Sequence, residues 1–487
     1  MRFSGDADLW LDYDNGEYVM IRISESVKGS GKLRRPLFGS RLCGVAIVLI
    51  SLAGSFPDSS HGQAAAGNDN EAPLTELTTR LRQENKLVGL AGMVMVDGKV
   101  VDSAVDGERK TGSGVWLEIG DRWHLGSVTK SITATMIARL VESGRMQWSD
   151  SIGKCFPDES IHEDWKPVTL IQLLTHTAGA PANFSVLVNF KRPALGLECT
   201  KARREEVLNV VANKPAHPPG QKFAYSNVGY TMAGAMAEEA TGATWEDLVK
   251  REVFEPLKLM GVGFGPPKSS AEKLEQPRGH RTVLGLKVGL SDDADNTPII
   301  GPAGIVHMTL NDLCTYATEH LSGDLGAGQL LSAETYKLLH APVIDQYACG
   351  WVKKEPSTEI PHTVYWHNGS NTMWYALVVF IPEKKMVVAI TSNDGDRKKA
   401  EAAAWEIVKA HFPAELSHHA PPQQAGDKTS PFTAVRWRES QPEVRLGEEW
   451  FKLVSLDEIR PPRSWLSAGG PMEFCGVNDS KRTSSSC

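Results

Sequence analysis

The sequence has 487 residues, of which 41% are hydrophobic and 23% are charged, so its composition is that of a globular protein long enough for a large two-lobed domain with additional segments. Its formal net charge of -7 excludes the basic footprint of a nucleic-acid-binding protein. We therefore expect a small-molecule or peptide partner and no nucleic acid.

Residues 1–66 form two segments of different composition. Residues 1–31 are polar, Gly-rich and acidic, and we expect a disordered extension or a stretch upstream of the true start. Residues 32–66 have the three parts of a secretory signal peptide: a cationic lead, the apolar run 42–56 and an alanine-rich exit. This run has about fifteen residues, short of the roughly twenty that a spanning helix needs. We expect export to the periplasm or the cell exterior, with no stable membrane span after cleavage; a retained anchor at residues 42–56 is the alternative.

We expect residues 73–413 to form the folded domain. Leucines at helical spacing predict a first helix near residues 77–87, and two apolar runs around Asp97-Gly98 predict a β-hairpin. The segment 123–142 then has apolar or small residues at the spacing of one buried helix face.

Ser127 lies in the first turn of that predicted helix, and Lys130 follows three residues later on the same side. A serine hydroxyl becomes a nucleophile when a neighbour takes its proton, and a helix N-terminus favours developing negative charge. The pair is therefore a candidate nucleophile and base. An ordinary N-cap serine with a solvated lysine is the alternative.

The middle of the domain is helical in pattern, with helices expected over 168–179, 204–213 and 228–240. Just before the last of these, Tyr225 and Asn227 can place a proton carrier and a hydrogen-bond donor on one side of a cleft. The alternative is a core tyrosine followed by an N-cap asparagine.

Strand patterns return at residues 347–352 and 362–366 and on both sides of the turn at 382–385, before a closing helix at 400–411. Strands at both ends of the domain and helices between them imply one antiparallel sheet built from both ends. The fold class is therefore α/β of the α+β type.

A third candidate cluster lies at the end of one predicted strand. Gly369 allows a backbone to approach a ligand closely, Ser370 offers a backbone N–H, and His367 precedes them. An edge strand with free donors can bind an extended substrate and, with the N–H of Ser127, form an oxyanion hole. The alternative is a surface turn.

Past the domain, residues 414–431 have the Pro, Gln and Gly composition of a linker. Alternating patterns predict a small β appendage at 432–460, too short for a core of its own, and we expect a disordered tail at 461–487. The cysteines have no metal-ligand spacing, and no pattern requires a disulfide. We expect neither a metal nor another cofactor.

The three clusters, in this order, resemble the serine β-lactamase and penicillin-binding protein superfamily. The branch they resemble is class C, which includes D,D-carboxypeptidases, D-aminopeptidases and carboxylesterases. The phrases LLTHTAG at 173–179 and GPAGIVHMTLNDLCTYA at 301–317 support the resemblance. It implies an antiparallel sheet flanked by helices, an all-helical subdomain and an active site between them.

The resemblance also implies roles for the candidate residues. Ser127 would be the acylated nucleophile, and either Lys130 or Tyr225 would take its proton. Tyr225 would carry a proton to the leaving group and activate the deacylating water, and Asn227 would orient the substrate amide or the lysine.

The third cluster has a role in the resemblance as well. The N–H groups of Ser127 and Ser370 would hold the oxyanion beside Gly369, and His367 would line the opposite wall. Dedicated β-lactamases usually carry a lysine in place of this histidine, and a mostly neutral histidine favours an esterase, amidase or peptidase.

These residues predict an exported serine hydrolase that forms an acyl-enzyme with an ester, amide or β-lactam. The alternative is a non-catalytic penicillin-binding or sensor domain on the same fold. The sequence indicates neither the substrate nor the oligomeric state. His176, within LLTHTAG, we interpret as structural.

Overall fold

The structure is a computed structural model that describes residues 73–270 and 272–412 in full. It also describes the backbone of five further strands, which are β1 (Asp8–Tyr13), β2 (Glu17–Arg22), β14 (Phe432–Arg438), β15 (Gln441–Leu446) and β16 (Glu449–Lys452). The predicted signal peptide, linker and tail lie outside the described residues. The chain divides into two units, Met1–Ala64 and Ala65–Cys487.

In the first unit, β1 and β2 pair as antiparallel strands, in a stretch for which we expected no regular structure. An Asn-Gly pair, the sequence signal of a hairpin turn, separates the two strands in the sequence. In the predicted appendage, β14, β15 and β16 form an antiparallel sheet in that order.

A six-stranded antiparallel sheet is the centre of the second unit, in the order β10-β11-β12-β13-β3-β4. Its strands are β3 (Gly89–Val96), β4 (Lys99–Gly107), β10 (Val352–Lys354), β11 (Val364–Ser370), β12 (Tyr375–Ile381) and β13 (Met386–Ser392). Because β13 pairs with β3, the two ends of the domain share one sheet, as the sequence predicted.

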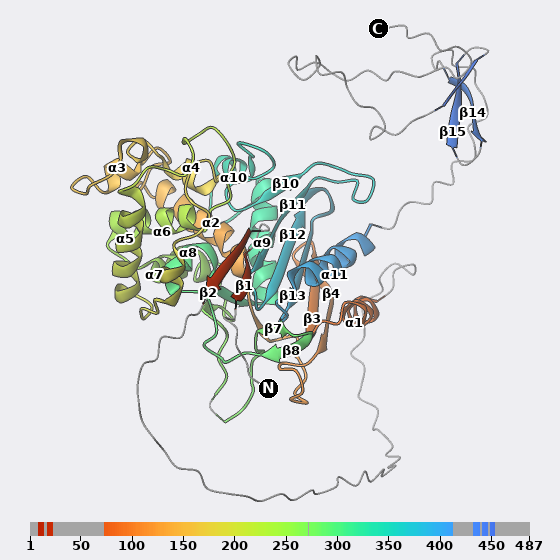
Figure 1. Cartoon of the computed structure of the whole chain (residues 1–487), viewed down its shortest axis with the longest axis horizontal. Helices are drawn as coiled ribbons and strands as arrows, with labels where there is room; N and C mark the ends of the chain where they lie inside the picture. The colour runs from red at the N-terminus through yellow and green to blue at the C-terminus, as the bar shows by residue number, and fades with distance from the viewer. Residues whose placement is uncertain are drawn as a thin grey trace, which may run out of the picture. The chain divides into compact units, whose positions relative to one another are not determined.

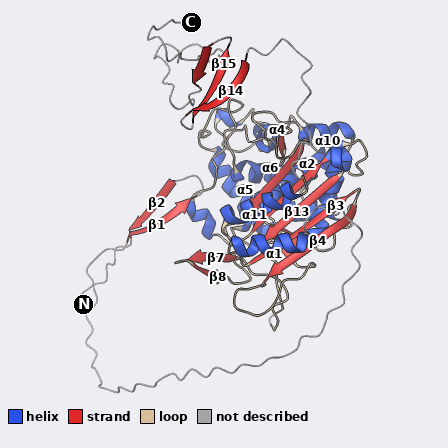
Figure 2. Ribbon diagram, turned by 90° about the vertical axis from the view of Figure 1, so that its right-hand side faces the viewer, coloured by secondary structure: helices blue, strands red, loops and turns tan. Residues whose placement is uncertain are grey.

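Helices cover both faces of this sheet (Figures 1 and 2). On one face lie α1 (Leu74–Glu84) and α11 (Arg397–Ala410), and on the other lies α9 (Leu310–Asp324). Every residue of β12 is buried between these layers, which explains its unbroken apolar sequence. The predicted layering of helices on an antiparallel sheet is confirmed.

The remaining helices gather beside the sheet, on the left of Figure 1. They are α2 (Thr129–Glu142), α3 (Ile152–Cys155), α4 (Leu170–Leu174), α5 (Leu197–Val211), α6 (Asn227–Thr241), α7 (Trp245–Val249), α8 (Gly301–Gly304) and α10 (Ala333–His340). We predicted one buried face for α2, but its first ten residues are all buried. It packs against α6, α7 and α8, which makes it the central helix of the fold.

Two expected elements are shorter than predicted. The helix expected over 168–179 ends at Leu174, because His176 and Gly179 both have positive φ and turn the chain. The strand expected over 347–352 is a loop up to β10, in which Tyr347 makes isolated bridges to Ile344 and Val352. This loop brings Tyr347 towards the candidate site.

Two small sheets were not predicted. In one, β5 (Arg122–His124), β9 (Val306–Thr309) and β6 (Gly263–Phe264) pair in that order, and β5 leads directly into the Ser127 region. In the other, β7 (His280–Val283) pairs with β8 (Leu286–Gly289). Among the described helices, none is both long and apolar enough to cross a membrane.

Candidate active site

Ser127 lies in a 3-10 turn, η1 (Gly126–Val128), that joins β5 to α2. Gly126 has a φ of +50°, and a Cβ atom there would lie 2.4 Å from the backbone nitrogen of Ser370. This position therefore requires glycine. The turn places Ser127 at the start of the buried central helix, one turn before Lys130.

The side chain of Lys130 is completely buried and lies among three oxygen atoms. Its Nζ lies 3.0 Å from Ser127 Oγ, 2.7 Å from Asn227 Oδ1 and 2.8 Å from the carbonyl oxygen of Ala303. Burial lowers the pKa of Lys130 well below its ordinary range, because the buried ammonium loses its hydration. The site therefore favours a neutral amine.

A neutral amine has two N–H groups and one lone pair. The oxygens of Asn227 and Ala303 can only accept hydrogen bonds, so they take both N–H groups. The lone pair is then left for Ser127, whose hydroxyl is the one partner of the three that can donate. This arrangement is that of a base held against a nucleophile.

Tyr225 lies over the same group, with its ring centroid 4.8 Å from Lys130 Nζ and a side-chain hydrogen bond to Ser127. Burial raises the pKa of Tyr225 above its ordinary value, and the hydrogen bond to Ser127 opposes that shift. About a third of the residue is exposed, at 37%, so solvent offsets part of the effect of burial on this pKa. A raised pKa keeps the phenol protonated at neutral pH, which favours Lys130 as the first proton acceptor.

Asn227 is the first residue of α6, and its carboxamide is fixed at both ends. Its Oδ1 faces Lys130, and its Nδ2 donates to Asn183 Oδ1 at 2.7 Å. The helix is capped by Ser226, whose Oγ accepts from the Gly229 N–H at 2.8 Å, so the alternative of an N-cap at Asn227 is wrong. Asn183 was not predicted, since it lies in a loop without a motif.

His367 lies in β11 and is almost fully buried. Its Nδ1 donates to the Asn368 carbonyl at 2.5 Å, so its Nε2 accepts from the Tyr347 hydroxyl at 3.0 Å. Burial and then Lys130 lower the pKa of His367 to about 3. The ring is therefore neutral at physiological pH and supplies no cation for a substrate carboxylate.

Gly369 and Ser370 complete β11 past the end of β10, where the strand lies against η1. A Cβ atom on Gly369 would lie 2.5 Å from the backbone nitrogen of Ser127. The two backbones that carry the Ser127 and Ser370 N–H groups are therefore in direct contact. The alternative of a surface turn at this sequence is wrong, because these residues belong to a strand.

Aromatic rings line the inner side of Tyr225. The ring centroid of His176 lies 4.4 Å from that of Tyr225 and 4.6 Å from that of Tyr347, with the rings tilted to each other by 43° and 47°. Its Nδ1 accepts from the backbone N–H of Ser226 at 3.1 Å. This bond holds the segment before α6, in agreement with the structural interpretation of His176. Tyr347 was not singled out in the sequence because no local pattern marks it.

The remaining polar clusters add no metal site. Within the described residues, no group of three or more His, Cys, Asp or Glu side chains is arranged to hold a metal ion. Cys155, Cys199, Cys314 and Cys349 are free thiols.

The Beta-lactamase family model matches residues 74–412. The chain belongs to the beta-lactamase family. This match confirms the resemblance inferred from the three clusters, and it covers most of the chain.

Relatives in the beta-lactamase family share limited identity with this chain. Penicillin-binding protein 4 of Amycolatopsis lactamdurans is 25% identical over 335 residues, which cover 65% of this chain and 83% of that protein. The D-alanyl-D-alanine-carboxypeptidase/endopeptidase AmpH of Escherichia coli (strain K12) is 25% identical over 240 residues, or 48% of this chain and 59% of AmpH. The match therefore spans less than two thirds of AmpH.

Solved structures share the beta-lactamase fold at lower identity. The octameric penicillin-binding protein homologue from Pyrococcus abyssi has a TM-score of 0.57 and 21% identity, over 77% of this chain and 88% of that one. A D-stereospecific amidohydrolase from Streptomyces sp. has a TM-score of 0.53 and 21% identity, over 68% of this chain and 98% of that one. At this identity the likeness establishes the fold alone.

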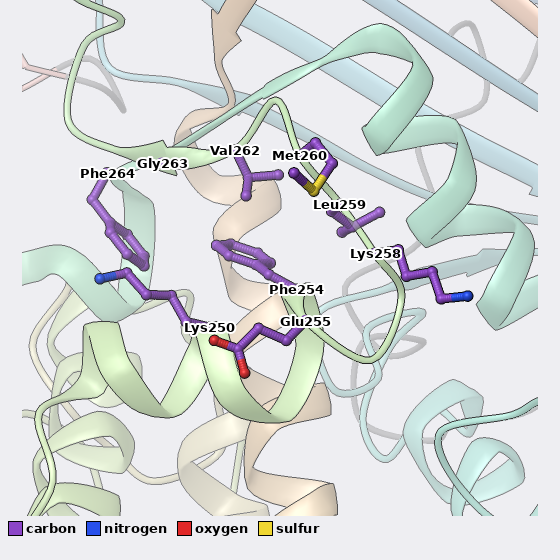
Figure 3. Close-up of a pocket in the computed structure, with 9 residues that line it drawn as sticks. All are labelled: Lys250, Phe254, Glu255, Lys258, Leu259, Met260, Val262, Gly263 and Phe264. Carbon is purple, nitrogen blue, oxygen red and sulfur yellow. The ribbon is translucent and has the colours of Figure 1, made fainter.

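Apart from the predicted site, the beta-lactamase-family domain has a surface hollow of about 420 Å³ next to a π-helical segment, η4 (Lys250–Phe254) (Figure 3). Phe254 lies between Phe264 on one side and Leu259 and Met260 on the other, and Lys258 points away from the hollow. None of its lining residues belongs to the predicted site. The buried polar groups that converge on one another lie instead around Ser127 and Lys130.

Proposed function

We propose that this chain is a serine hydrolase that acts through a covalent acyl-enzyme on an ester, amide or β-lactam. The observation that carries the proposal is the position of Lys130 Nζ, 3.0 Å from Ser127 Oγ and bonded to two other oxygens that can only accept. A binding protein does not need a buried amine held against a hydroxyl, since burying an amine costs free energy. This argues for catalysis over a sensor domain.

Acylation begins when Ser127 Oγ gives its proton to the lone pair of Lys130 Nζ and attacks the carbonyl carbon of the substrate. A C–O bond forms, and the carbonyl π electrons move onto the oxygen. The backbone N–H groups of Ser127 and Ser370 stabilise the resulting oxyanion.

The tetrahedral intermediate then collapses. The bond from carbon to the leaving nitrogen or oxygen breaks, and the leaving group receives the proton from Lys130 through the Tyr225 hydroxyl. In deacylation, water loses a proton along the same route and its oxygen bonds to the acyl carbon. The bond from that carbon to Ser127 Oγ then breaks, the carboxylic acid leaves, and Ser127 Oγ takes the proton back. Every proton moved in the cycle is thus carried by Ser127, Lys130, Tyr225 or water.

The neutral His367 favours substrates whose recognition does not depend on a cation at this place. We therefore propose an esterase, amidase or peptidase activity in preference to one tuned to β-lactam antibiotics. Relatives named as a D-alanyl-D-alanine-carboxypeptidase/endopeptidase and as a D-stereospecific amidohydrolase make D-amino-acid peptides and amides the first substrates to test.

A fluorophosphonate probe tests the nucleophile, because it labels a serine only where the hydroxyl is activated. We expect labelling of the wild-type protein and its loss in Ser127→Ala. The matched control is Ser151→Ala, which alters another Ser-x-x-Lys sequence whose serine caps the short helix α3. Undiminished labelling of Ser127→Ala would refute the assignment. A protein that is silent towards the probe, p-nitrophenyl esters, D-Ala-D-Ala peptides and nitrocefin would support the sensor alternative.

We also propose that the protein is exported after cleavage of residues 32–66, on the basis of their composition. N-terminal sequencing of protein recovered outside the cytoplasm tests this. A mature chain that still carries Trp10 and Tyr13 would contradict it.

A further inference from the structure

The proposed oxyanion hole needs two backbone N–H groups at a fixed spacing, since such donors work only when they are held in place before the charge forms. Gly126 and Gly369 let the two backbones touch: a Cβ atom on Gly126 would lie 2.4 Å from the Ser370 nitrogen, and one on Gly369 would lie 2.5 Å from the Ser127 nitrogen. This contact allows the required spacing of the two N–H groups but does not fix it. Hydrogen-bonded side chains on both sides of the contact connect the two backbone segments.

On the nucleophile side, the link is His124, the last residue of β5. Its ring is completely buried, and its Nδ1 accepts from the backbone N–H of Gly126 at 3.1 Å. Because this nitrogen accepts, the ring hydrogen is on Nε2. Nε2 therefore donates to Asp295 Oδ2, at 3.0 Å.

On the strand side, the link is Asn371, which directly follows Ser370 and is also buried. Its Oδ1 accepts from the backbone N–H groups of Met373 and Trp374, at 3.2 Å and 3.1 Å. Its Nδ2 therefore points away from them and donates to Asp295 Oδ1, at 2.8 Å.

We propose that Asp295 is a positioning residue that sets the spacing of the two oxyanion-hole donors, an inference that rests on the proposed hydrolase function. One carboxylate accepts from both sides of the hole, through His124 on one side and Asn371 on the other. A carboxylate suits this place because both of its oxygens accept and both partners can only donate there. The side chain is 8% exposed, so water does not replace these bonds readily.

No local motif marks His124 or Asp295 in the sequence. The ring of His124 acts through the backbone N–H of Gly126, behind the nucleophile, and is hydrogen-bonded to no reacting atom. Asp295 lies at the end of a loop whose sequence has no readable motif.

Asp295→Asn tests the proposal, because a carboxamide has one accepting oxygen and one NH2 group, which would face a donor. We expect kcat to fall about 10- to 100-fold, less than the roughly 10²- to 10³-fold that loss of a donor itself costs, with KM changed less than about twofold. The inhibition constant of phenylboronic acid, which forms a tetrahedral adduct with the serine, should rise by the same factor as kcat/KM falls. A merely structural role would not couple these two quantities.

The matched control is Asp292→Asn in the same loop. Its carboxylate is 47% exposed and pairs with Arg278 at 3.3 Å, so kcat and the inhibition constant should stay at the wild-type values. Rates are expressed per site titrated with the fluorophosphonate, and thermal melts report folding.

His124→Asn is the second variant, because the shorter side chain keeps an acceptor for Gly126 but does not reach Asp295. It should lower kcat by a similar factor, and the combined His124→Asn, Asp295→Asn variant should lose little more than Asp295→Asn alone, since both changes break the same link. If Asp295→Asn does not fold, His124→Asn decides.

The outcomes separate the inference from the proposed function. An unlabelled, inactive wild-type protein overturns both. The wild-type protein could be labelled and active while its folded Asp295→Asn or His124→Asn variants keep the wild-type kcat and change only in KM. That result overturns the role of Asp295 and leaves the proposed hydrolase function intact. A coupled loss of kcat and boronate affinity supports the role.

Discussion

Asn227 Oδ1 lies 2.7 Å from Lys130 Nζ, and the carboxamide is held in this orientation because its Nδ2 donates to Asn183 Oδ1. The lysine therefore faces an acceptor without charge. A carboxylate in the same place would hold the ammonium form, whereas the amide leaves the low pKa that burial produces. The proposed base thus depends on a neutral neighbour as much as on its own burial.

The first prediction is that Asn227→Asp moves the pH profile. The new carboxylate raises the pKa of Lys130, so at any given pH less of the amine is neutral, and the acidic limb of kcat/KM shifts to higher pH. Activity at neutral pH falls and recovers as the pH is raised. Asn183→Ala is the control, since it loosens the amide without adding charge and should lower the rate with little shift of the limb. An unmoved limb in Asn227→Asp would contradict the role of Lys130 as base.

The second prediction concerns the charge of residue 130. Lys130→Arg keeps a cation whose pKa stays too high for a base, so we expect kcat/KM for an ester to fall about 10²- to 10⁴-fold, as for Lys130→Met. Steady-state rates per folded protein measure this. A Lys130→Arg variant with near wild-type activity would mean that the positive charge, and not proton transfer, is what the site needs.

Tyr225 should matter more for poor leaving groups than for good ones. A p-nitrophenolate departs without a proton, whereas an amine must be protonated, so Tyr225→Phe should slow hydrolysis of an anilide at least about tenfold more than that of the matching p-nitrophenyl ester. The comparison uses one acyl group on both substrates. Equal losses on the two would argue that the phenol positions the substrate and carries no proton to the leaving group.

The sequence predicted the parts of this site that lie in long periodic elements. The helix that starts at Asn227 and the strand that contains His367 have clear patterns, and each motif is complete within a few residues. The order of the clusters then indicated the family and the fold, because one sheet closed by both ends of the domain places the motifs together.

The supporting residues could not be predicted, for a physical reason. Asn183, Asp295 and Tyr347 lie in loops and act on partners far away in the sequence, so neither periodicity nor a motif marks them. The strand β5 has three residues, too few to show alternation. The buried surroundings of α2 were also missed, since a helix covered on all sides lacks the polar face that a pattern search expects.

The close contact at Gly126 predicts a steric effect that a control can separate from backbone strain. Gly126→Ala adds a Cβ atom 2.4 Å from the Ser370 nitrogen at a φ of +50°, so the two backbones must separate and activity should be lost. Gly112→Ala has a φ of +72° with no atom within 4 Å, so it should cost about 1–2 kcal/mol in unfolding free energy and leave kcat unchanged. Equal activity in the two variants would contradict the contact.

Acid should destabilise the fold through its buried neutral histidines. Burial lowers the pKa of His307 to about 4, below its ordinary value near 6.5, so between these two pH values the unfolded chain binds a proton that the folded chain does not. The contribution of His307 to the free energy of unfolding is therefore complete above pH 6.5. It is lost as the pH drops towards 4, by up to about 1.4 kcal/mol per pH unit.

His307→Gln removes that titration while keeping a neutral polar side chain of similar length. Guanidinium unfolding at pH 7, 6 and 5 should give a shallower loss of stability for the variant than for the wild type, by about 1 kcal/mol per pH unit. Other histidines with lowered pKa, among them His367, keep titrating in both proteins and so cancel in the comparison. Parallel curves would contradict the prediction. They would mean that His307, although only 6% exposed, takes up a proton as readily in the folded protein as in the unfolded chain.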